Sequence, residues 1–279
     1  MKRLTLILAF NACACLSLFA QVADGDRHYA MRAEGAQGGR AKAEHIDAAI
    51  AAYQRGGTLE SQWKLLRAYR FRGAYVASTN DEKKKVYGAA KKAGEQALAA
   101  VNRQLAARGV KANAPEKQVA EAARAIPGAA EVFLWDAVNW GEWALAYGKM
   151  AAVREGAADR IRREATIAML IDPRIEGGAP ARVLGRLHDQ TPRIPFITGW
   201  ASQKEAVRFL NESLKLDPSN KVTIVFLAEA MVSNDAKTKP QAIKLLRDTI
   251  STPNDPEFPV EQAAAVDDAR ALLKKWGSS

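Results

Sequence analysis

Few side chains in this sequence have the types and spacing that catalysis or metal binding requires. His28, His45 and His188 are far apart in the chain, and only the last is next to a carboxylate, Asp189. The usual His/Cys spacing of a metal site is therefore missing, and we predict no bound metal and no cofactor. The sequence also contains no phosphate-binding loop, dinucleotide-binding glycine motif, zinc-protease motif or serine nucleophile motif. It gives no positive reason to predict an enzyme.

The most aromatic stretch of the chain is residues 131–150, EVFLWDAVNWGEWALAYGKM. At helical spacing it is apolar around most of its circumference, which is typical of a helix buried at the centre of a fold. The alternative is a cavity lined by Trp135, Trp140 and Trp143, because a ring with one polar edge suits an amphipathic ligand. Asn139 is then a polar group that could contact this ligand. Both interpretations stay open at this point.

A second group of candidate residues follows a glycine pair. Gly177 and Gly178 predict a turn, after which Pro180 begins a short helix. Arg182 lies in the first turn of that helix, where the helix dipole disfavours a cation. A carboxylate partner or an anionic ligand would compensate; the alternatives are an arginine that reaches into solvent or an internal salt bridge. Gly185 lies one turn further along.

The loop after this helix, HDQTPRIPFITGW (residues 188–200), combines two prolines with large apolar side chains. Phe196 and Trp200 would be costly to leave in water, and so would the isoleucines beside Phe196. The loop therefore either folds back on the protein or forms an interface.

The helices that position these residues repeat a pattern. Two helices end in AMLIDPR and SLKLDPS, and each has a small residue five positions before its proline. The matched positions are Ile161, Ala168 and Pro173 in one copy and Ala206, Ser213 and Pro218 in the other, with a weaker copy ending at Pro253. A period near ~34 residues is that of tetratricopeptide arrays. The larger gap between Pro173 and Pro218 indicates an insertion, which we place at residues 177–200.

We therefore predict an all-α protein of stacked antiparallel helical hairpins, a tetratricopeptide-like array. Residues 40–279 form a single helical-repeat domain, and the polar, glycine-rich residues 21–39 are expected to be a flexible leader. Two capping boxes are predicted to mark helix starts, Ser202 with Glu205 and Thr238 with Gln241.

The first twenty residues have the order of a secretory signal: Lys2 and Arg3, an apolar stretch, and then Ala20. We predict cleavage after Ala20 and export to the periplasm; the less favoured alternative is lipoprotein processing at Cys13 or Cys15. No other segment is apolar enough to cross a membrane, so we expect no transmembrane segment in the mature chain.

The chain carries a formal net charge of +10, and losing Lys2 and Arg3 leaves +8. This charge predicts attraction to acidic partners or lipid headgroups. The lysine-rich helix expected over residues 82–107 lacks the aromatic side chains on which bases stack, and an exported protein meets little nucleic acid, so we expect no nucleic-acid partner.

The order of these features resembles the T-component proteins of tripartite ATP-independent periplasmic (TRAP) transporters, over roughly residues 59–275. The matching features are Phe133-Leu134-Trp135 with Trp140-Gly141, Leu170-Ile171-Asp172-Pro173, Gly177-Gly178 with Arg182 and Leu184-Gly185, Ala206 through Pro218, and Glu261 with Ala269 and Leu272-Leu273. The resemblance implies a periplasmic, helical, non-enzymatic partner of a solute-binding protein, in a homo-oligomer that is a trimer with a pore through each protomer. Family members are commonly lipoproteins, whereas this chain favours plain cleavage.

Three hypotheses of function follow, in this order. The first is a scaffold that docks a partner protein through the curved surface of its repeats. The second is a binder or carrier of a small hydrophobic or amphipathic ligand, held by the tryptophans of residues 131–150 and the 192–200 loop. The third, an enzyme, would need titratable side chains that converge in a cleft.

Overall fold

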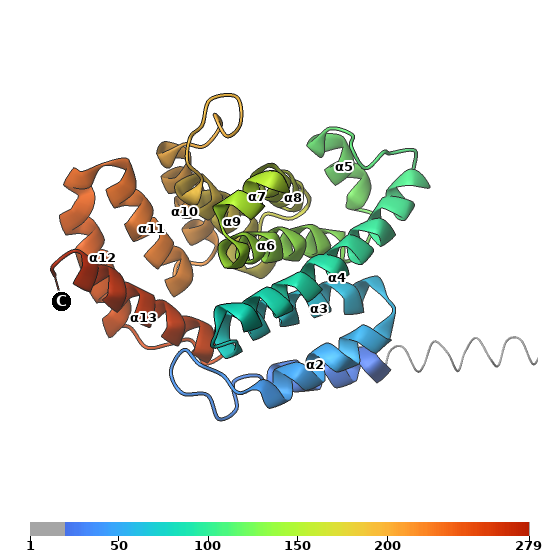
Figure 1. The fold of residues 1–279 in the computed structure, drawn as a ribbon, viewed down its shortest axis with the longest axis horizontal. Helices are drawn as coiled ribbons and strands as arrows, with labels where there is room; N and C mark the ends of the chain where they lie inside the picture. The colour runs from blue at the N-terminus through green and yellow to red at the C-terminus, as the bar shows by residue number, and fades with distance from the viewer. Residues whose placement is uncertain (1–19, 279) are drawn as a thin grey trace, which may run out of the picture.

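The structure, a computed structural model, describes residues 20–278, which are built from helices and contain no β-strand (Figure 1). An N-terminal helix covers residues 20–30. The elements after it are α2 (Ala43–Gly56), α3 (Leu59–Phe71), the π-helical turn η1 (Arg72–Val76), α4 (Asn80–Ala106), α5 (Glu116–Ala123), α6 (Ala129–Tyr147), α7 (Lys149–Arg154), α8 (Ala157–Ile171), α9 (Ile175–Gln190), α10 (Gln203–Leu216), α11 (Lys221–Asn234), the short 3₁₀ turn η2 (Ala236–Thr238), α12 (Lys239–Ser251) and α13 (Pro259–Lys275). The predicted all-α fold is confirmed.

Each of the longer helices packs mainly against its neighbours along the chain, as in a stacked repeat protein. Helices α9 and α10 form one hairpin, α11 and α12 the next, and α6 pairs with α8 across the short helix α7 (Figure 1). No helix within residues 20–278 is long and apolar enough to cross a membrane. The signal sequence and the two cysteines predicted from residues 1–19 lie outside the described residues.

The predicted repeat register is confirmed at its small residues. Ala168 and Ser213 are both fully buried, and so is Ala206. Ala168 lies in a core cluster with Ala179 of α9, and a side chain added at Gly178 would come within 3.2 Å of the Ser213 backbone. Small residues at these positions let successive helices approach closely, which is why the spacing is visible in the sequence.

The insertion is shorter than residues 177–200. Residues 179–190 are the regular part of α9 and pack along α10, so they belong to a hairpin of the array. Only residues 191–202 form the extra loop. The prediction placed the insertion too early because Gly177, Gly178 and Pro180 are typical of irregular backbone. Pro180, however, lies in the first turn of the regular helix, where proline is tolerated.

Neither of the two predicted capping boxes forms in full. The Ser202 hydroxyl accepts a hydrogen bond from the Glu205 amide over 3.4 Å, as expected, but the Ser202 amide donates to His188 Nδ1 over 3.2 Å and not to the Glu205 side chain. Thr238 instead donates its hydroxyl hydrogen to the Asp235 carbonyl over 2.7 Å, because the turn η2 precedes α12 and continues into it.

The N-terminal segment differs from the flexible leader expected from the sequence. Residues 20–30 are helical, and the Asp26 carboxylate accepts hydrogen bonds from Tyr53 and Lys64 over 2.8 and 2.7 Å. Arg32 is buried, and its guanidinium lies 3.0 Å from Glu261 in α13. This ion pair joins the segment after the N-terminal helix to the first turn of α13, so early and late parts of the array are in contact.

Helices α4 and α6 cross at Gly94, in close contact with the buried Asp136 carboxylate. A methyl group at Gly94 would overlap the Asp136 side chain, which is ion-paired to Arg160 at 2.8 Å. The crossing therefore requires glycine, because any larger residue would separate the helices or break the ion pair.

We expect Gly94→Ala to lower the free energy of unfolding by at least about 2 kcal/mol. Gly141→Ala is the matched control, because it makes the same change inside a helix where nothing lies within 4 Å of the new methyl group. It should raise stability by roughly 0.5–1 kcal/mol through its helix propensity. Urea unfolding of the purified proteins measures both; equal effects would disprove the close crossing.

Candidate functional site: the interhelical charges and the exposed loop

The tryptophans of α6 are packed into the core. Trp140 and Trp143 are buried and meet edge to face, with ring centroids 5.4 Å apart. Cations cover the Trp140 ring: Lys91 and Arg160 each lie 4.5 Å from its centroid. Trp135 belongs to a different core cluster. The three rings therefore do not line one cavity.

Asn139 also has a structural role. Its side-chain amide donates to the Leu66 carbonyl of α3 over 2.9 Å and to the Trp135 carbonyl over 2.8 Å. It therefore joins α6 to α3. The clearest surface hollows formed by residues 20–278 lie away from all of these residues, one lined by Ile250, Val266 and Arg270 and the other by Pro218, Leu245 and Thr249 among others. The packing thus favours the core interpretation of the aromatic stretch.

A buried acidic pair accompanies the tryptophans and was not found from the sequence. Arg160 lies 2.8 Å from Asp136 and 3.0 Å from Glu164, and both carboxylates are buried. Burial raises the pKa of each, and for Glu164 the neighbouring Asp136 charge raises it further. An aspartate in an otherwise apolar helix was the only sequence signal for this pair.

The glycine pair forms a kink at the start of α9. Glu176, Gly177 and Gly178 all have positive φ, with values of 48°, 62° and 79°. Gly178 and Gly185 both face α10, where an added side chain would collide with Ser213 and Leu210. The glycines therefore serve close packing and a backbone reversal.

Arg182 projects from the first regular turn of α9 toward α11. Its Nη1 donates to the Thr223 hydroxyl over 3.3 Å, and no carboxylate within residues 20–278 lies within 4.0 Å of it. Burial, with a smaller contribution from the Arg70 guanidinium, lowers the pKa of Arg182 to about 10. The predicted carboxylate partner is therefore not present among the described residues, and because the side chain is half-buried, part of it reaches the surface.

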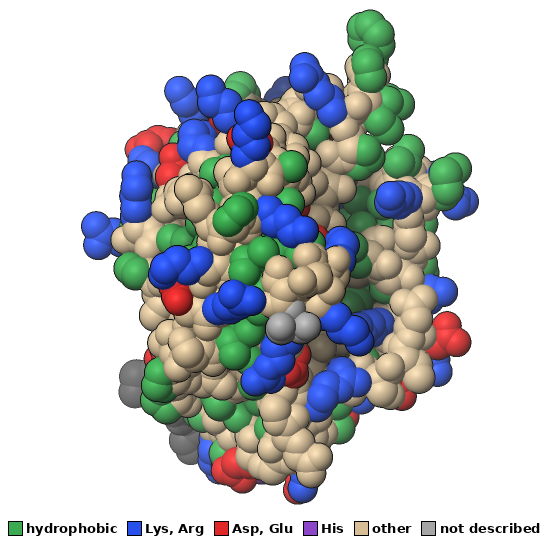
Figure 2. Space-filling model, turned by 90° about the vertical axis from the view of Figure 1, so that its left-hand side faces the viewer, with side chains coloured by type: hydrophobic (Ala, Val, Ile, Leu, Met, Phe, Trp, Pro, Cys, Tyr) green, Lys and Arg blue, Asp and Glu red, His purple; other side chains and the backbone are tan. Residues whose placement is uncertain are grey.

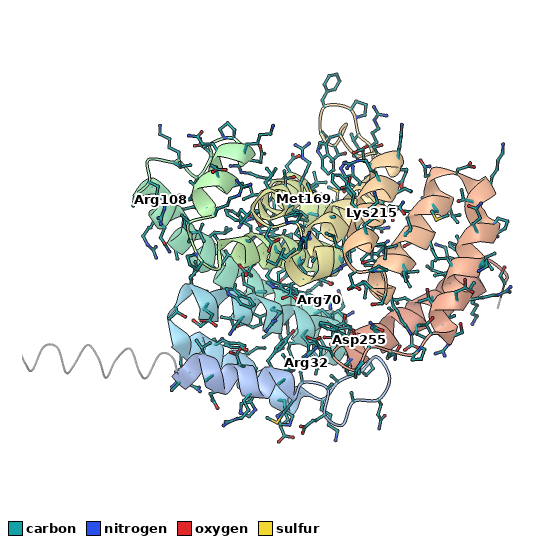
Figure 3. All side chains as sticks on the ribbon, turned by 180° about the vertical axis from the view of Figure 1, so that it is seen from behind. Arg32, Arg70, Arg108, Met169, Lys215 and Asp255 are labelled. Atoms are coloured by element: carbon teal, nitrogen blue, oxygen red, sulfur yellow. The ribbon has the colours of Figure 1, made fainter. Side chains whose placement is uncertain are left out.

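The neighbouring arginines have carboxylate partners, which come from several helices. The pairs are Arg67 with Glu176 at 3.4 Å, Arg70 with Glu142 at 3.6 Å, and Arg186 with Glu229 at 2.5 Å. Figure 3 shows Arg70 near the middle of the molecule and Arg32 close to Asp255. These ion pairs join α3 to α9, α3 to α6 and α9 to α11.

The loop of residues 191–202 presents apolar side chains from a firmly held backbone. Buried Thr198 accepts a hydrogen bond from the Ile194 amide over 3.0 Å and donates to the Pro192 carbonyl over 2.5 Å. Trp200 donates to Asp159 of α8 over 2.9 Å. Phe196 at the tip is fully exposed. Trp200 therefore anchors the loop to α8, and Phe196 is the side chain that the loop exposes to solvent.

A second exposed apolar group lies at the same end of α8 and was missed in the sequence. Leu145 is 75% exposed, Met150 80% and Val153 59%, all from the end of α6 and from α7. Helix α7 leads directly into the first turn of α8, to which Trp200 is bonded. We call these three residues, with Ile194, Phe196 and Ile197, the apolar rim. Figure 2 shows apolar side chains projecting at the top of the molecule, where Figure 1 places this loop.

Comparisons with known proteins do not extend these observations. No protein-family model matches the sequence, and no curated protein matches it either. The resemblance to T-component proteins therefore stays a prediction.

The acidic pair predicts a pH dependence of stability. Because the pKa values of Asp136 and Glu164 are raised by folding, the folded protein holds protons that the unfolded chain has released. This contribution is complete below the ordinary carboxyl pKa and is lost as pH rises through the folded value. His188, whose pKa burial lowers, contributes with the opposite sign. The contribution of the acidic pair is therefore measured by comparing the pH dependence of unfolding free energy between the wild type and a variant.

Glu164→Gln should reduce the fall in unfolding free energy between pH 5 and pH 8 by about 1 kcal/mol or more, since one pKa unit corresponds to about 1.4 kcal/mol. Urea unfolding at a series of pH values measures this. Glu212→Gln, at an exposed residue paired with exposed Arg208, is the control and should change the profile little. A Glu164→Gln profile parallel to that of the wild type would contradict the assignment.

Proposed function

We propose that this chain is a non-enzymatic docking scaffold, whose helical array holds the apolar rim in place to bind a partner protein. The observation that supports this most is Phe196, a large apolar side chain fully exposed at the tip of an anchored loop. Its φ of 63° is uncommon for a bulky residue and strains the backbone. Strain of this kind persists where the surrounding structure fixes it, and it is concentrated at binding sites.

The composition of the rim also supports a partner. Its six large apolar side chains lie on two exposed segments, one joined by Trp200 to the first turn of α8 and the other leading directly into that turn. Single exposed apolar residues are ordinary, but a group of this kind marks an interaction surface. Aromatic anchors at the centre of such a surface carry most of the binding free energy, and Phe196 is placed to be that anchor.

The charges around the rim favour an acidic partner. Lys149, Arg154 and Arg193 are exposed within or beside the two rim segments, and no ion pair joins them to a carboxylate of residues 20–278. The nearby carboxylates are engaged elsewhere: Glu155 lies 2.8 Å from Lys91, and Asp159 accepts from Trp200. Positive charge around an apolar centre complements a pocket bordered by carboxylates and speeds its encounter with the rim.

The resemblance to T-component proteins supplies the class of partner. It implies an extracytoplasmic solute-binding protein, which the two proteins' export to the periplasm would bring within reach of the rim. We therefore propose a folded solute-binding protein with an acidic surface as the occupant. A lipid surface and a second copy of this chain are the occupants that the experiment must distinguish from it.

The test places a photo-crosslinking amino acid at position 196 of the full chain and identifies the adduct formed in intact cells by mass spectrometry. We expect one folded protein, cross-linked through an acidic surface. The same probe at position 258, where Phe258 is also partly exposed but lies far from the rim in sequence, is the control and should not give this adduct. Adducts with lipid alone, or with this chain alone, would contradict the proposal.

With the identified partner purified, Phe196→Ser should weaken binding at least about tenfold, because a buried aromatic anchor contributes ~2 kcal/mol or more. Arg193→Glu should slow association and make it less sensitive to salt. Leu216→Ser removes a partly exposed apolar residue outside the rim and should leave the affinity unchanged. Calorimetry and stopped-flow kinetics provide these values.

A further inference from the structure

The base of the exposed loop contains a buried histidine that accepts a hydrogen bond. His188 lies near the end of α9, where the loop leaves the α9–α10 hairpin (Figure 1), and is only 8% exposed. Its Nδ1 accepts from the Ser202 backbone amide over 3.2 Å, at the point where the loop ends and α10 begins. A ring nitrogen accepts only when the imidazole is neutral and the other nitrogen carries the hydrogen. This contact therefore requires a neutral His188.

The same ring supports the side chain that anchors the loop. Trp200 meets His188 edge to face, with ring centroids 5.2 Å apart, and Phe209 of α10 stacks on the other ring at 5.6 Å from the imidazole. Trp200 also donates to Asp159 of α8 over 2.9 Å. His188 thus lies between the loop anchor and α10, so a change in the imidazole acts on the loop at both Ser202 and Trp200.

The charges nearest to His188 mostly oppose a positive ring. Arg162 of α8 and Arg208 of α10 cover the two aromatic rings that flank the imidazole, at 4.6 and 3.9 Å from their centroids. Glu205 of α10 favours the charged form, but it is already paired with Arg208 at 2.7 Å. Burial is the largest effect, and with the two arginines it outweighs Glu205, so the pKa of His188 is lowered from its ordinary value of 6.5.

The other charged groups around the ring are engaged elsewhere or point to solvent. Asp159 accepts from Trp200, and Asp189 of α9 is paired with Arg186 at 3.1 Å. The only charged residue of the loop, Arg193, is exposed. No carboxylate of residues 20–278 forms an ion pair with the imidazole. The surroundings therefore do not stabilise a protonated ring in place.

We propose that His188 is a pH-sensitive latch, whose protonation releases the loop of residues 191–202 from α9. A proton on Nδ1 turns this acceptor into a donor, so the Ser202 amide then faces an N–H and the bond between them is lost. The hydrogen bonds of Thr198 lie within the loop and do not hold it to α9. The latch is a property of this chain alone; only its effect on docking rests on the proposed function.

The latch is closed at neutral pH and opens in acid. A released His188 regains its ordinary pKa of about 6.5, whereas the latched ring has a lower one. The closed loop is therefore fully favoured above pH 6.5 and loses its advantage as the pH falls below this value. The ratio of released to latched loop should rise by up to about tenfold per pH unit, until the latched ring is itself protonated.

Hydrogen exchange of the purified full protein, resolved by nuclear magnetic resonance between pH 7.5 and pH 5, measures this release. After correction for the intrinsic exchange rate, protection of the Ser202 amide and of the Trp200 indole N–H should fall together, by up to about tenfold per pH unit. His188→Asn places a side-chain oxygen close to the position of Nδ1 and does not titrate, so its protection should stay constant. His45→Asn makes the same change in α2 and should follow the wild type.

Two further measurements keep the test specific to the latch. His188→Phe keeps a ring but has no acceptor, so both protons should be poorly protected at every pH. The amide of Leu210, which is fully buried in α10, should keep its protection throughout. Constant protection in the wild type would overturn the proposal, and so would a loss that persists in His188→Asn. Loss at Ser202 alone, or a parallel loss at Leu210, would replace the latch by a local change or by global unfolding and overturn it equally.

Discussion

The ion pair between Arg32 and Glu261 is the contact on which the shape of this molecule depends. Stacked helical hairpins contact only their neighbours, so an array of this kind has two free ends. Here Arg32 also donates to the Glu257 carbonyl over 2.9 Å and packs over the Tyr29 ring. Gly39 approaches the Ala264 backbone beside this pair. These contacts hold the segment after the N-terminal helix against the start of α13, so the array is joined across residues that are more than 200 positions apart.

Helix packing places charged side chains inside the protein at two locations. Around the tryptophans of α6, the buried acidic pair shares Arg160, and one oxygen of each carboxylate has no hydrogen-bond partner among residues 20–278. Arg182 is half-buried, and its guanidinium donates one hydrogen bond, to Thr223. In both places the partners come from different helices, so only the tertiary fold decides which charges are paired.

The apolar rim depends on an added loop anchored by Thr198 and Trp200. The array tolerates this loop because it leaves the α9–α10 hairpin intact. The interhelical ion pairs, in contrast, belong to the array itself, since they join α3 to α9, α3 to α6 and α9 to α11.

The sequence by itself determined the helices, their hairpin order and their register. These follow from side-chain periodicity within a few turns, so Ala168 and Ser213 could be placed in a helix interface without coordinates. It also identified Arg182 as a cation at an unfavourable helix end. The tertiary structure alone decided that residues 20–30 are an ordered helix, that the tryptophans are core, and that Phe196 is exposed while Trp200 is an anchor. Each of these features depends on a contact between residues that are tens of positions apart, such as Tyr53 with Asp26 or Trp200 with Asp159. No local sequence pattern specifies which distant side chains a fold brings together.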